Sequence, residues 1–168
     1  YPTRRILTMS TLNVKLDFYK EEYRQNLVDY HLSGEQSNYA SDPLPALLKC
    51  EEDNTRHPVV ILYNGEPAGF FILHGWEGVQ EYSDNKDAIL LRSYSVNPKF
   101  QGNGIAKQSL QVLDSFVKIN FPEVNEIILS VNYMNIVAQH VYKMAGFIDK
   151  GGRVMGRKGE LFILHKTL

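Results

Sequence analysis

The sequence is poor in cysteine and has no long hydrophobic run. Its one cysteine, Cys50, cannot form an internal disulfide, which fits a reducing compartment, and we expect this thiol to be structural or incidental. No stretch approaches the roughly 18 consecutive apolar residues that a membrane-spanning helix needs. No charged start followed by an apolar run indicates a signal peptide. These absences predict a soluble, cytoplasmic protein that does not act at a membrane.

The sequence also lacks an excess of charge of either sign, and it lacks the residue spacing of a metal site. Lysine and arginine number 18 and aspartate and glutamate 19, for a net charge of -1. This balance does not favour nucleic acid or another polyanion as a partner. The five histidines show no metal-ligand spacing. We therefore expect no metal, a small-molecule partner, and a monomer or homodimer.

The length of 168 residues and the hydrophobic content of 43% suffice for one domain with a sizeable core. We expect this domain to span residues 9–168. Because Met9 is a candidate native start, residues 1–8 are expected to be an expression remnant or a disordered N-terminus.

Residue periodicity predicts an α/β (α+β) domain with a mixed sheet. Alternating apolar residues at Leu12, Val14 and Leu16 predict a strand, and a helix capped by Asp17 is expected up to Tyr30. Asn64-Gly65 predicts a tight hairpin turn. Other strands are expected at 58–63, 67–73, 88–96, 126–131, 147–150 and 161–166, other helices at 45–52, 105–120 and 135–145, and loops at 75–87 and 151–159.

A small-residue loop, Gln-Gly-Asn-Gly at 101–104, joins a buried strand to a helix. Such a junction offers unpaired N–H groups and the positive end of a helix dipole to a phosphate, although a purely structural turn has the same pattern. A nucleotide P-loop would need Gly-Lys-Ser/Thr, where this chain has Ile105 and Ala106 after Gly104. A dinucleotide fingerprint would need a third glycine in place of Lys107.

The remaining reading is a resemblance to a known family. Residues 101–106, Gln-Gly-Asn-Gly-Ile-Ala, resemble the Q/R-x-x-G-x-G/A motif of GNAT acyltransferases, and residues 135–147 are similar to the family's second signature, N-x-x-A-x-x-L/V-Y-x-x-x-G-F. Both motifs stand at the expected separation, and the resemblance extends from about Leu12, more weakly in the first 55 residues. It implies a sheet of about seven strands with a splayed parallel pair, flanked by about four helices.

The resemblance also implies acetyl-CoA as cosubstrate, without a metal, and transfer of its acetyl group to a primary amine by direct attack. Gln101 would shape a loop whose backbone holds the pyrophosphate. Tyr94, Ser95 and Val96 would offer backbone groups to the pantetheine arm, which Asn135 would also contact. The cofactor-binding residues implied are Tyr94, Ser95, Val96, Gln101, Gly102, Asn103, Gly104, Ile105, Ala106, Asn135 and Tyr142.

Two catalytic roles follow from the same resemblance. Tyr142 would be the general acid that protonates the leaving thiolate, although periodicity alone makes it a core-facing aromatic residue. The backbone N–H of Val96 would donate to the thioester carbonyl. The general base stays unassigned, because the strand at 88–96 has no carboxylate and Arg92 occupies one plausible position for it.

The acceptor is the least defined part. The loop at 76–87 is acidic and aromatic, which suits a cationic amine but also an ordinary solvated loop. The candidate substrate-binding residues are Tyr30, Tyr39, Trp76, Glu77 and Glu81. A protein or peptide acetyltransferase and a non-catalytic acyl-CoA sensor remain alternatives.

Overall fold

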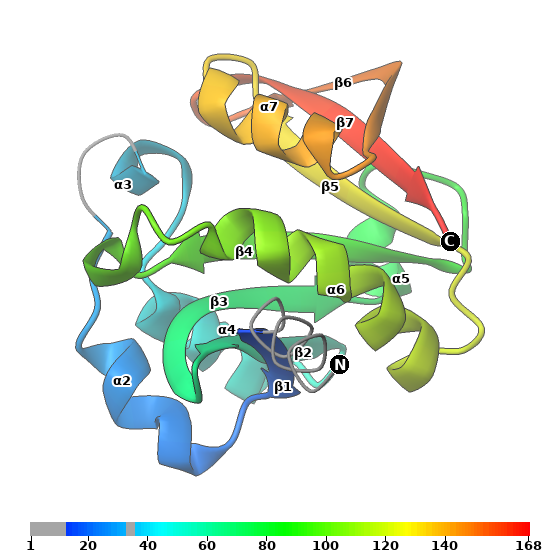
Figure 1. Cartoon of the computed structure of the whole chain (residues 1–168). Coiled ribbons are helices and arrows are strands. Elements are labelled where there is room, and N and C mark those ends of the chain that lie inside the picture. Colours follow the sequence, from blue (N-terminus) through cyan, green and yellow to red (C-terminus); the bar gives the residue numbers. More distant parts are fainter. Residues whose placement is uncertain (1–12, 33–35) are drawn as a thin grey trace, which may run out of the picture.

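One mixed sheet forms the centre of the chain, whose computed structural model describes residues 13–32 and 36–168 (Figure 1). The strands are β1 (Val14–Phe18), β2 (Arg56–Tyr63), β3 (Glu66–His74), β4 (Ala88–Val96), β5 (Glu126–Asn132), β6 (Ile148–Gly156) and β7 (Gly159–Thr167). They lie in the order β1-β2-β3-β4-β5-β7-β6, with β4 and β5 parallel and the other neighbours antiparallel. The expected mixed, mostly antiparallel sheet is confirmed. The expectations for residues 1–8 and Leu12 lie outside the described residues.

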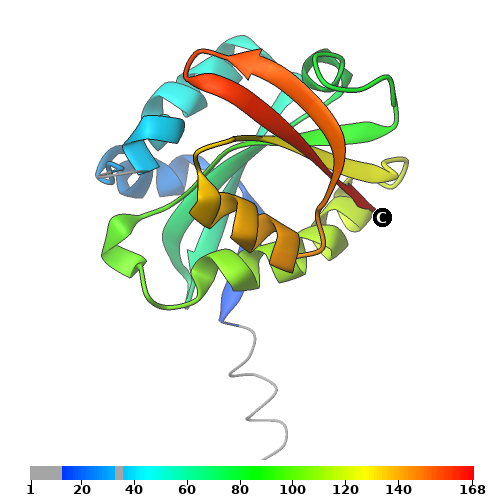
Figure 2. The same ribbon diagram turned by 90° about the horizontal axis from the view of Figure 1, so that it is seen from above.

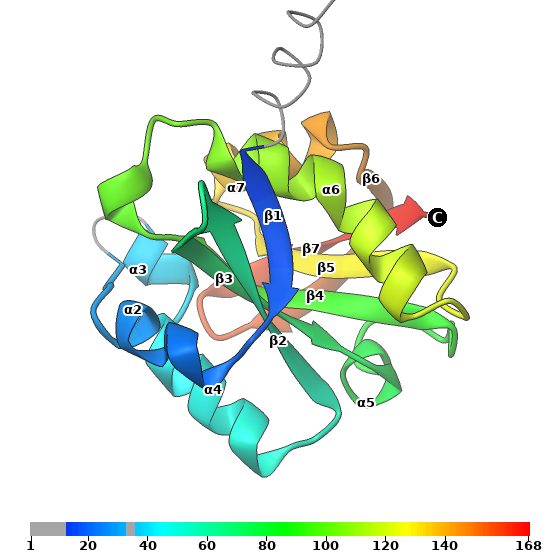
Figure 3. The same ribbon diagram turned by 60° about the horizontal axis from the view of Figure 1, so that its bottom comes forward.

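Helices cover both faces of the sheet. The helices α6 (Ile105–Asn120) and α7 (Ile136–Met144) lie side by side on one face (Figure 2). On the other face lie α2 (Arg24–Val28), α4 (Pro43–Glu52) and α5 (Trp76–Val79) (Figure 3). Val59 and Ile61 pack on the α6 face and Val60 on the α4 face, so β2 is a continuous apolar run rather than an alternating one.

The helix expected from Asp17 to Tyr30 is wrong in its first part. Asp17 and Phe18 still belong to β1, where they pair with β2, and a 3-10 turn, η1 (Glu21–Tyr23), precedes α2. Asp17 therefore does not cap a helix. Instead, its carboxylate accepts a 2.6 Å hydrogen bond from the Tyr23 hydroxyl, which fixes the turn against the strand end.

Of the two hairpins, β2–β3 matches the sequence prediction and β6–β7 differs from it. Asn64 (φ 51°) and Gly65 (φ 84°) form the predicted turn between β2 and β3, in the left-handed conformations that such a turn requires. In the last hairpin most of 151–159 is strand, contrary to the expected loop, and 157–158 form the turn. Arg153 lies 3.9 Å from the centre of the Phe162 ring on the neighbouring strand, which supports the longer pairing. The expected loop at 75–87 contains α5.

The parallel pair separates soon after it begins. β4 and β5 are in register through three residue pairs, from Ala88 with Glu126 to Leu90 with Ile128. Beyond Leu90, β4 has no partner on this side, although both strands continue to Val96 and Asn132. The splayed pair implied by the resemblance is therefore present, at the carboxyl ends of the two strands.

A β-bulge in β4 changes which side chains face each layer. Arg92 lies opposite Ile72 and Ser95 opposite Phe70, so Ser93 and Tyr94 share one partner position, and Ser93 has a φ of 57°. The extra residue reverses the alternation of side chains. As a result Tyr94 joins the core on the α6 face, whereas Ser95 turns toward the α2 and α4 face. Nothing in the sequence pattern predicts this bulge.

The thiol of Cys50 is half-buried on α4, against the core cluster beneath that helix. Burial raises the pKa of this thiol from about 9 to about 11. Because the thiolate is the reactive form, iodoacetamide at pH 7.5 should alkylate Cys50 about 100-fold more slowly than free cysteine. The rate is measured by mass spectrometry of the native protein, with the urea-unfolded chain as control. Alkylation at the rate of free cysteine would contradict a structural role.

Candidate active site

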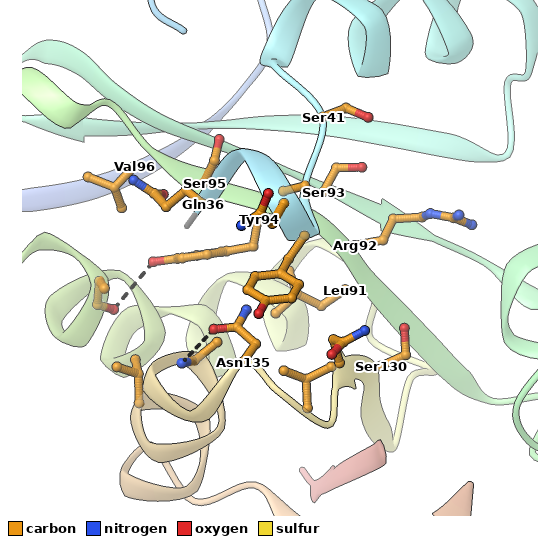
Figure 4. A pocket seen from close by; sticks show the side chains of 18 of the residues that line it. Gln36, Ser41, Leu91, Arg92, Ser93, Tyr94, Ser95, Val96, Ser130 and Asn135 are labelled. Atoms are coloured by element: carbon orange, nitrogen blue, oxygen red, sulfur yellow. Dashed lines mark hydrogen bonds between the residues drawn. The ribbon is translucent and has the colours of Figure 1, made fainter. Parts of the chain in front are cut away.

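A cleft of about 1000 Å³ opens where β4 and β5 separate. Its lining comes from the end of β4, the end of β5, the loop before α6, the first turns of α7, and the segment of α3 (Gln36–Tyr39) that leads into α4 (Figure 4). Segments far apart in the sequence therefore meet at the place where a sheet leaves backbone groups unpaired.

The loop entering α6 ends in a helix N-terminus that no side chain caps. The first helical bond runs from the Gln108 N–H to the Gly104 carbonyl, 3.1 Å away, so the N–H groups of Ile105, Ala106 and Lys107 have no helical acceptor. Free N–H groups and the positive end of a helix dipole are the groups that favour an anion at a helix start. The phosphate-binding role predicted for this loop stays a prediction.

Positive φ angles explain the two glycines of this loop. Gly102 has a φ of 88° and Gly104 a φ of 72°, a conformation that costs other L-residues about 1–2 kcal/mol. The Asn103 side chain donates a 2.8 Å hydrogen bond to the Phe100 carbonyl, which closes the loop on itself. Gln101, Gly102, Gly104, Ile105 and Ala106 line the cleft, whereas Asn103 is not among its lining residues.

The backbone of Val96 faces the edge of β4 that is no longer paired with β5. The Asn97 N–H donates to the Ala68 carbonyl of β3 at 2.8 Å. Because successive residues of a strand direct their backbone groups to opposite edges, the Val96 N–H points away from β3, toward the cleft. No residue of β5 is in register with Val96.

The side chains of Tyr94 and Ser95 hold β4 in place. The Tyr94 hydroxyl is hydrogen-bonded to Ser109 in the first turns of α6, toward which its ring points in Figure 4. Burial raises the pKa of this phenol. On the opposite face, the Ser95 hydroxyl is 2.7 Å from the Tyr30 hydroxyl. These contacts fix the two side chains on opposite faces of β4, while the Ser95 backbone is directed to β3, where its partner is Phe70.

Asn135 has the capping role that its sequence position suggests. Its side-chain oxygen accepts a 3.3 Å hydrogen bond from the Ala138 N–H, as the dashed line in Figure 4 marks. The amide nitrogen of this side chain has no partner among the described residues. Because Asn135 also lines the cleft, this amide nitrogen is a hydrogen-bond donor available at its wall.

Tyr142 of α7 lines the cleft beside Tyr94, their ring centres 6.2 Å apart in an edge-to-face arrangement. The ring of Phe147 supports it from the other side, at 5.9 Å. Its hydroxyl has no hydrogen-bond partner in the part of the chain that the structure describes. Burial, and then the neighbouring Tyr94, raise the pKa of this phenol, so it holds its proton at neutral pH.

The described residues that line the cleft include no Asp, Glu or His. Arg92 lines it instead, at the β4 position noted in the sequence, and in Figure 4 its side chain points away from Tyr94. No side chain of this lining is therefore an ordinary general base.

The expected acceptor residues are dispersed. Tyr39 lines the cleft, whereas Tyr30 is 3% exposed, lies in the core beneath α4 and does not line it. Trp76 and Glu77 belong to α5 and do not line it either; the Trp76 ring packs on the core cluster around Val79. Glu81 borders an adjoining hollow.

The sequence interpretation missed several lining residues, among them Lys49, Arg56, Tyr82, Arg157 and Lys158. They come from α4, β2, the loop after α5 and the β6–β7 turn. Each is an isolated residue on its own element, so no local pattern could have identified them. Within the described ranges, no group of three His, Cys, Asp or Glu side chains could hold a metal ion. No helix there combines the length and hydrophobicity of a membrane span.

Comparisons with known proteins agree with this geometry. The model of the acetyltransferase (GNAT) family matches residues 17–147. The uncharacterized N-acetyltransferase YbbJ of Bacillus subtilis is 42% identical over 159 residues, 94% of this chain and 99% of that protein. The spermine/spermidine N(1)-acetyltransferase of Bacillus subtilis is 25% identical over 141 residues, 83% and 91% of the two chains. The crystal structure of aminoglycoside acetyltransferase AAC(6')-Ib in complex with coenzyme A has a TM-score of 0.71 at 21% identity, covering 92% of this chain and 94% of that chain.

Proposed function

This chain belongs to the acetyltransferase (GNAT) family, and we propose that it transfers the acetyl group of acetyl-CoA to a primary amine of a small molecule. The uncapped N-terminus of α6, open to the cleft that Tyr142 also lines, is the observation that carries the proposal. Relatives named for spermine, spermidine and aminoglycosides support a small-molecule amine.

The loop at 101–106 fits the pyrophosphate of coenzyme A. The backbone N–H groups of residues 102–106 would hold it, since Gly102 leaves open space where a side chain would stand. Gln101 would shape the loop. The amide nitrogen of Asn135 and the backbone of Tyr94 and Val96 would hold the pantetheine arm, whereas the Ser95 backbone, which the sequence interpretation included, is directed to β3.

Acetyl-CoA supplies an acetyl group activated as a thioester. In the proposed transfer the amine nitrogen attacks the carbonyl carbon, and the Val96 N–H donates to the oxygen that becomes negative. Removing one such donor typically costs about 10²–10³ in rate. The carbon–sulfur bond then breaks and Tyr142 gives its proton to the thiolate. The nitrogen loses a proton to water, and a proton from water restores the Tyr142 phenol. The products are an acetamide and free CoA.

The amine must reach the cleft in its neutral form, because no lining carboxylate or imidazole removes its proton. An ammonium of pKa about 10.4 is mostly protonated at neutral pH, so the neutral fraction limits the rate. This requirement replaces the general base that the sequence interpretation left unassigned.

A thiol-release screen with acetyl-CoA tests the proposal. Polyamines, amino acids, aminoglycosides and short peptides form the panel, and at least one small amine should release CoA and yield its acetamide by mass spectrometry. Tight CoA binding without acetylation of any member would argue for a sensor module. Acetylation confined to the peptides would argue for a peptide acetyltransferase.

Charge at the N-terminus of α6 should control coenzyme binding. Gly104→Asp and Gly104→Asn are nearly isosteric, and both side chains tolerate a positive φ and cap a helix. The aspartate alone adds a negative charge beside the proposed pyrophosphate. We expect its Kd for CoA, measured by calorimetry, to exceed that of Gly104→Asn at least tenfold at a similar Tm. Equal Kd values would remove the loop from the coenzyme site.

Loss of the Tyr142 hydroxyl should slow the transfer without weakening coenzyme binding. For Tyr142→Phe we expect kcat to fall about 10²-fold, the scale of a lost general acid, with an unchanged Kd for CoA. Tyr133→Phe, an exposed tyrosine outside the cleft lining, is the matched control. Unchanged kcat in Tyr142→Phe would exclude this phenol from proton transfer.

The pH dependence should follow the amine. With an acceptor of pKa about 10.4, kcat/KM should rise about tenfold per pH unit from pH 7 to 9. Tyr142 must stay protonated, and since burial raises its pKa above the ordinary 10.0, no descending limb should appear below pH 10. Initial rates in overlapping buffers give the profile. A plateau that begins near neutral pH would instead reveal a base on the protein.

A further inference from the structure

The lining of the cleft carries an excess of positive charge. Among the described residues it includes five cationic side chains and no carboxylate: Lys49, Arg56, Arg92, Arg157 and Lys158. Arg157 and Lys158 are exposed on the β6–β7 turn, where they attract an anion at long range. The net charge of the whole chain is -1, so this local excess is not a reflection of composition.

Arg56 and Arg92 stand close together on one face of the sheet. Arg56 pairs with His74 across β2 and β3, and Arg92 is the partner of Ile72, two residues earlier on β3. These side chains lie on the face covered by α4 and α5, since Val60, Ile72 and Leu90 of the same alternation pack there. Lys49 reaches the cleft from α4 above them.

Hydrogen bonds hold Arg92 in place without neutralising it. The Thr55 hydroxyl donates to Asp53 at 2.5 Å, so it accepts from Nε2–H of His74 at 3.0 Å. The other nitrogen of this ring, Nδ1, is then free to accept from the Arg92 guanidinium at 3.2 Å. Burial, and the nearby guanidinium groups, lower the pKa of His74, which keeps the ring neutral.

The carboxylates near this site are either bound already or exposed to solvent. Hydrogen bonds from Thr55 lower the pKa of Asp53 to about 2, and Asp53 also pairs with Arg56 at 3.2 Å. Glu81 borders the adjoining hollow together with Arg92, and its charge acts on this guanidinium, but Glu81 is exposed and forms no ion pair with any described residue. Arg92 likewise forms no ion pair with a described carboxylate. It keeps most of its five donors for a ligand.

A half-buried guanidinium without a counter-ion is costly, and its planar fork matches a carboxylate through two parallel hydrogen bonds. The coenzyme does not meet this need, because its proposed pyrophosphate site at α6 lies on the opposite face of the sheet. β4 itself separates the two.

Within the proposed function, we infer that the amine acceptor also carries a carboxylate, held by Arg92 with Arg56 and Lys49 beside it. Amino acids and related amino carboxylates are the corresponding class. A polyamine or aminoglycoside brings its positive charges against these three side chains, so such polycations are poor acceptors.

Matched pairs of acceptors test this inference. Glycine and methylamine, β-alanine and ethylamine, γ-aminobutyrate and propylamine, and lysine and cadaverine differ in each case by the carboxylate, and the series varies its distance from the amine. Spermidine represents the polycations. In at least one pair the acceptor with the carboxylate should have a kcat/KM at least tenfold higher than its partner. The kcat/KM of spermidine should be lower than that of this acceptor.

Substitution assigns the preference to Arg92. Arg92→Gln keeps a hydrogen-bond donor for His74 but removes the charge. It should abolish the preference for the acceptor with a carboxylate, while the Kd for CoA stays unchanged. Arg92→Lys should restore part of it. Arg24→Gln, which removes an exposed arginine paired with Glu51, is the control and should leave it intact. A preference that survives in Arg92→Gln overturns the assignment.

The remaining outcomes are equally decisive. Equal or faster turnover of the decarboxylated amines, of spermidine or of O-phosphoethanolamine refutes a carboxylate acceptor and leaves the transferase function standing. If no amine is acetylated, the transferase function fails. Calorimetric titration of the same pairs into the protein with CoA then decides the inference: saturable binding of the carboxylates alone supports it, and no binding overturns it.

Discussion

The separation of β4 from β5 is the constraint on which the rest of the structure depends. A buried sheet normally satisfies the backbone groups on both edges of every inner strand. Here register stops at Leu90 and Ile128, so the carboxyl end of β4 faces space with its backbone groups available. The start of α6, the cap of α7 and the hydrogen bond between Tyr94 and Ser109 all meet at this gap. In the proposed complex the pantetheine arm of acetyl-CoA, rather than a neighbouring strand, forms hydrogen bonds with this free edge of β4.

The two sides of the cleft differ in the groups that line them. On the α6 face, phenols and main-chain donors surround the proposed coenzyme site, and the charge there comes from a helix dipole. On the α4 face, fixed cations form the surface and His74 orients one of them. In the proposed complex the start of α6 binds the pyrophosphate and Arg92 binds a carboxylate. The two sites are independent, so both anionic groups would be bound at once.

Regular elements and the glycine loop were predictable from the sequence because their signals are local. β4 was predicted at its observed bounds, and the Asn64-Gly65 turn and the capping Asn135 occur where expected. The bulge at Ser93 was not predictable, since Ser93 carries no turn signal. The cluster of Arg56, His74 and Arg92 was not predictable either, because these residues meet only through strand pairing. Asp17 was misjudged because pairing of β1 with β2 overrode a helix-start pattern.

The single inserted residue at Ser93 reverses the alternation of side chains along β4, so that even-numbered positions change from one face of the sheet to the other. Upstream of it, Arg92 turns to the α4 side, and downstream Tyr94 and Val96 turn to the α6 side. A substitution at residue 92 therefore does not alter the side chains of Tyr94 and Val96, which project from the opposite face of β4. If Arg92 selects the acceptor as proposed, a single substitution there would let the family evolve a new acceptor preference while the residues proposed for acetyl transfer stayed the same.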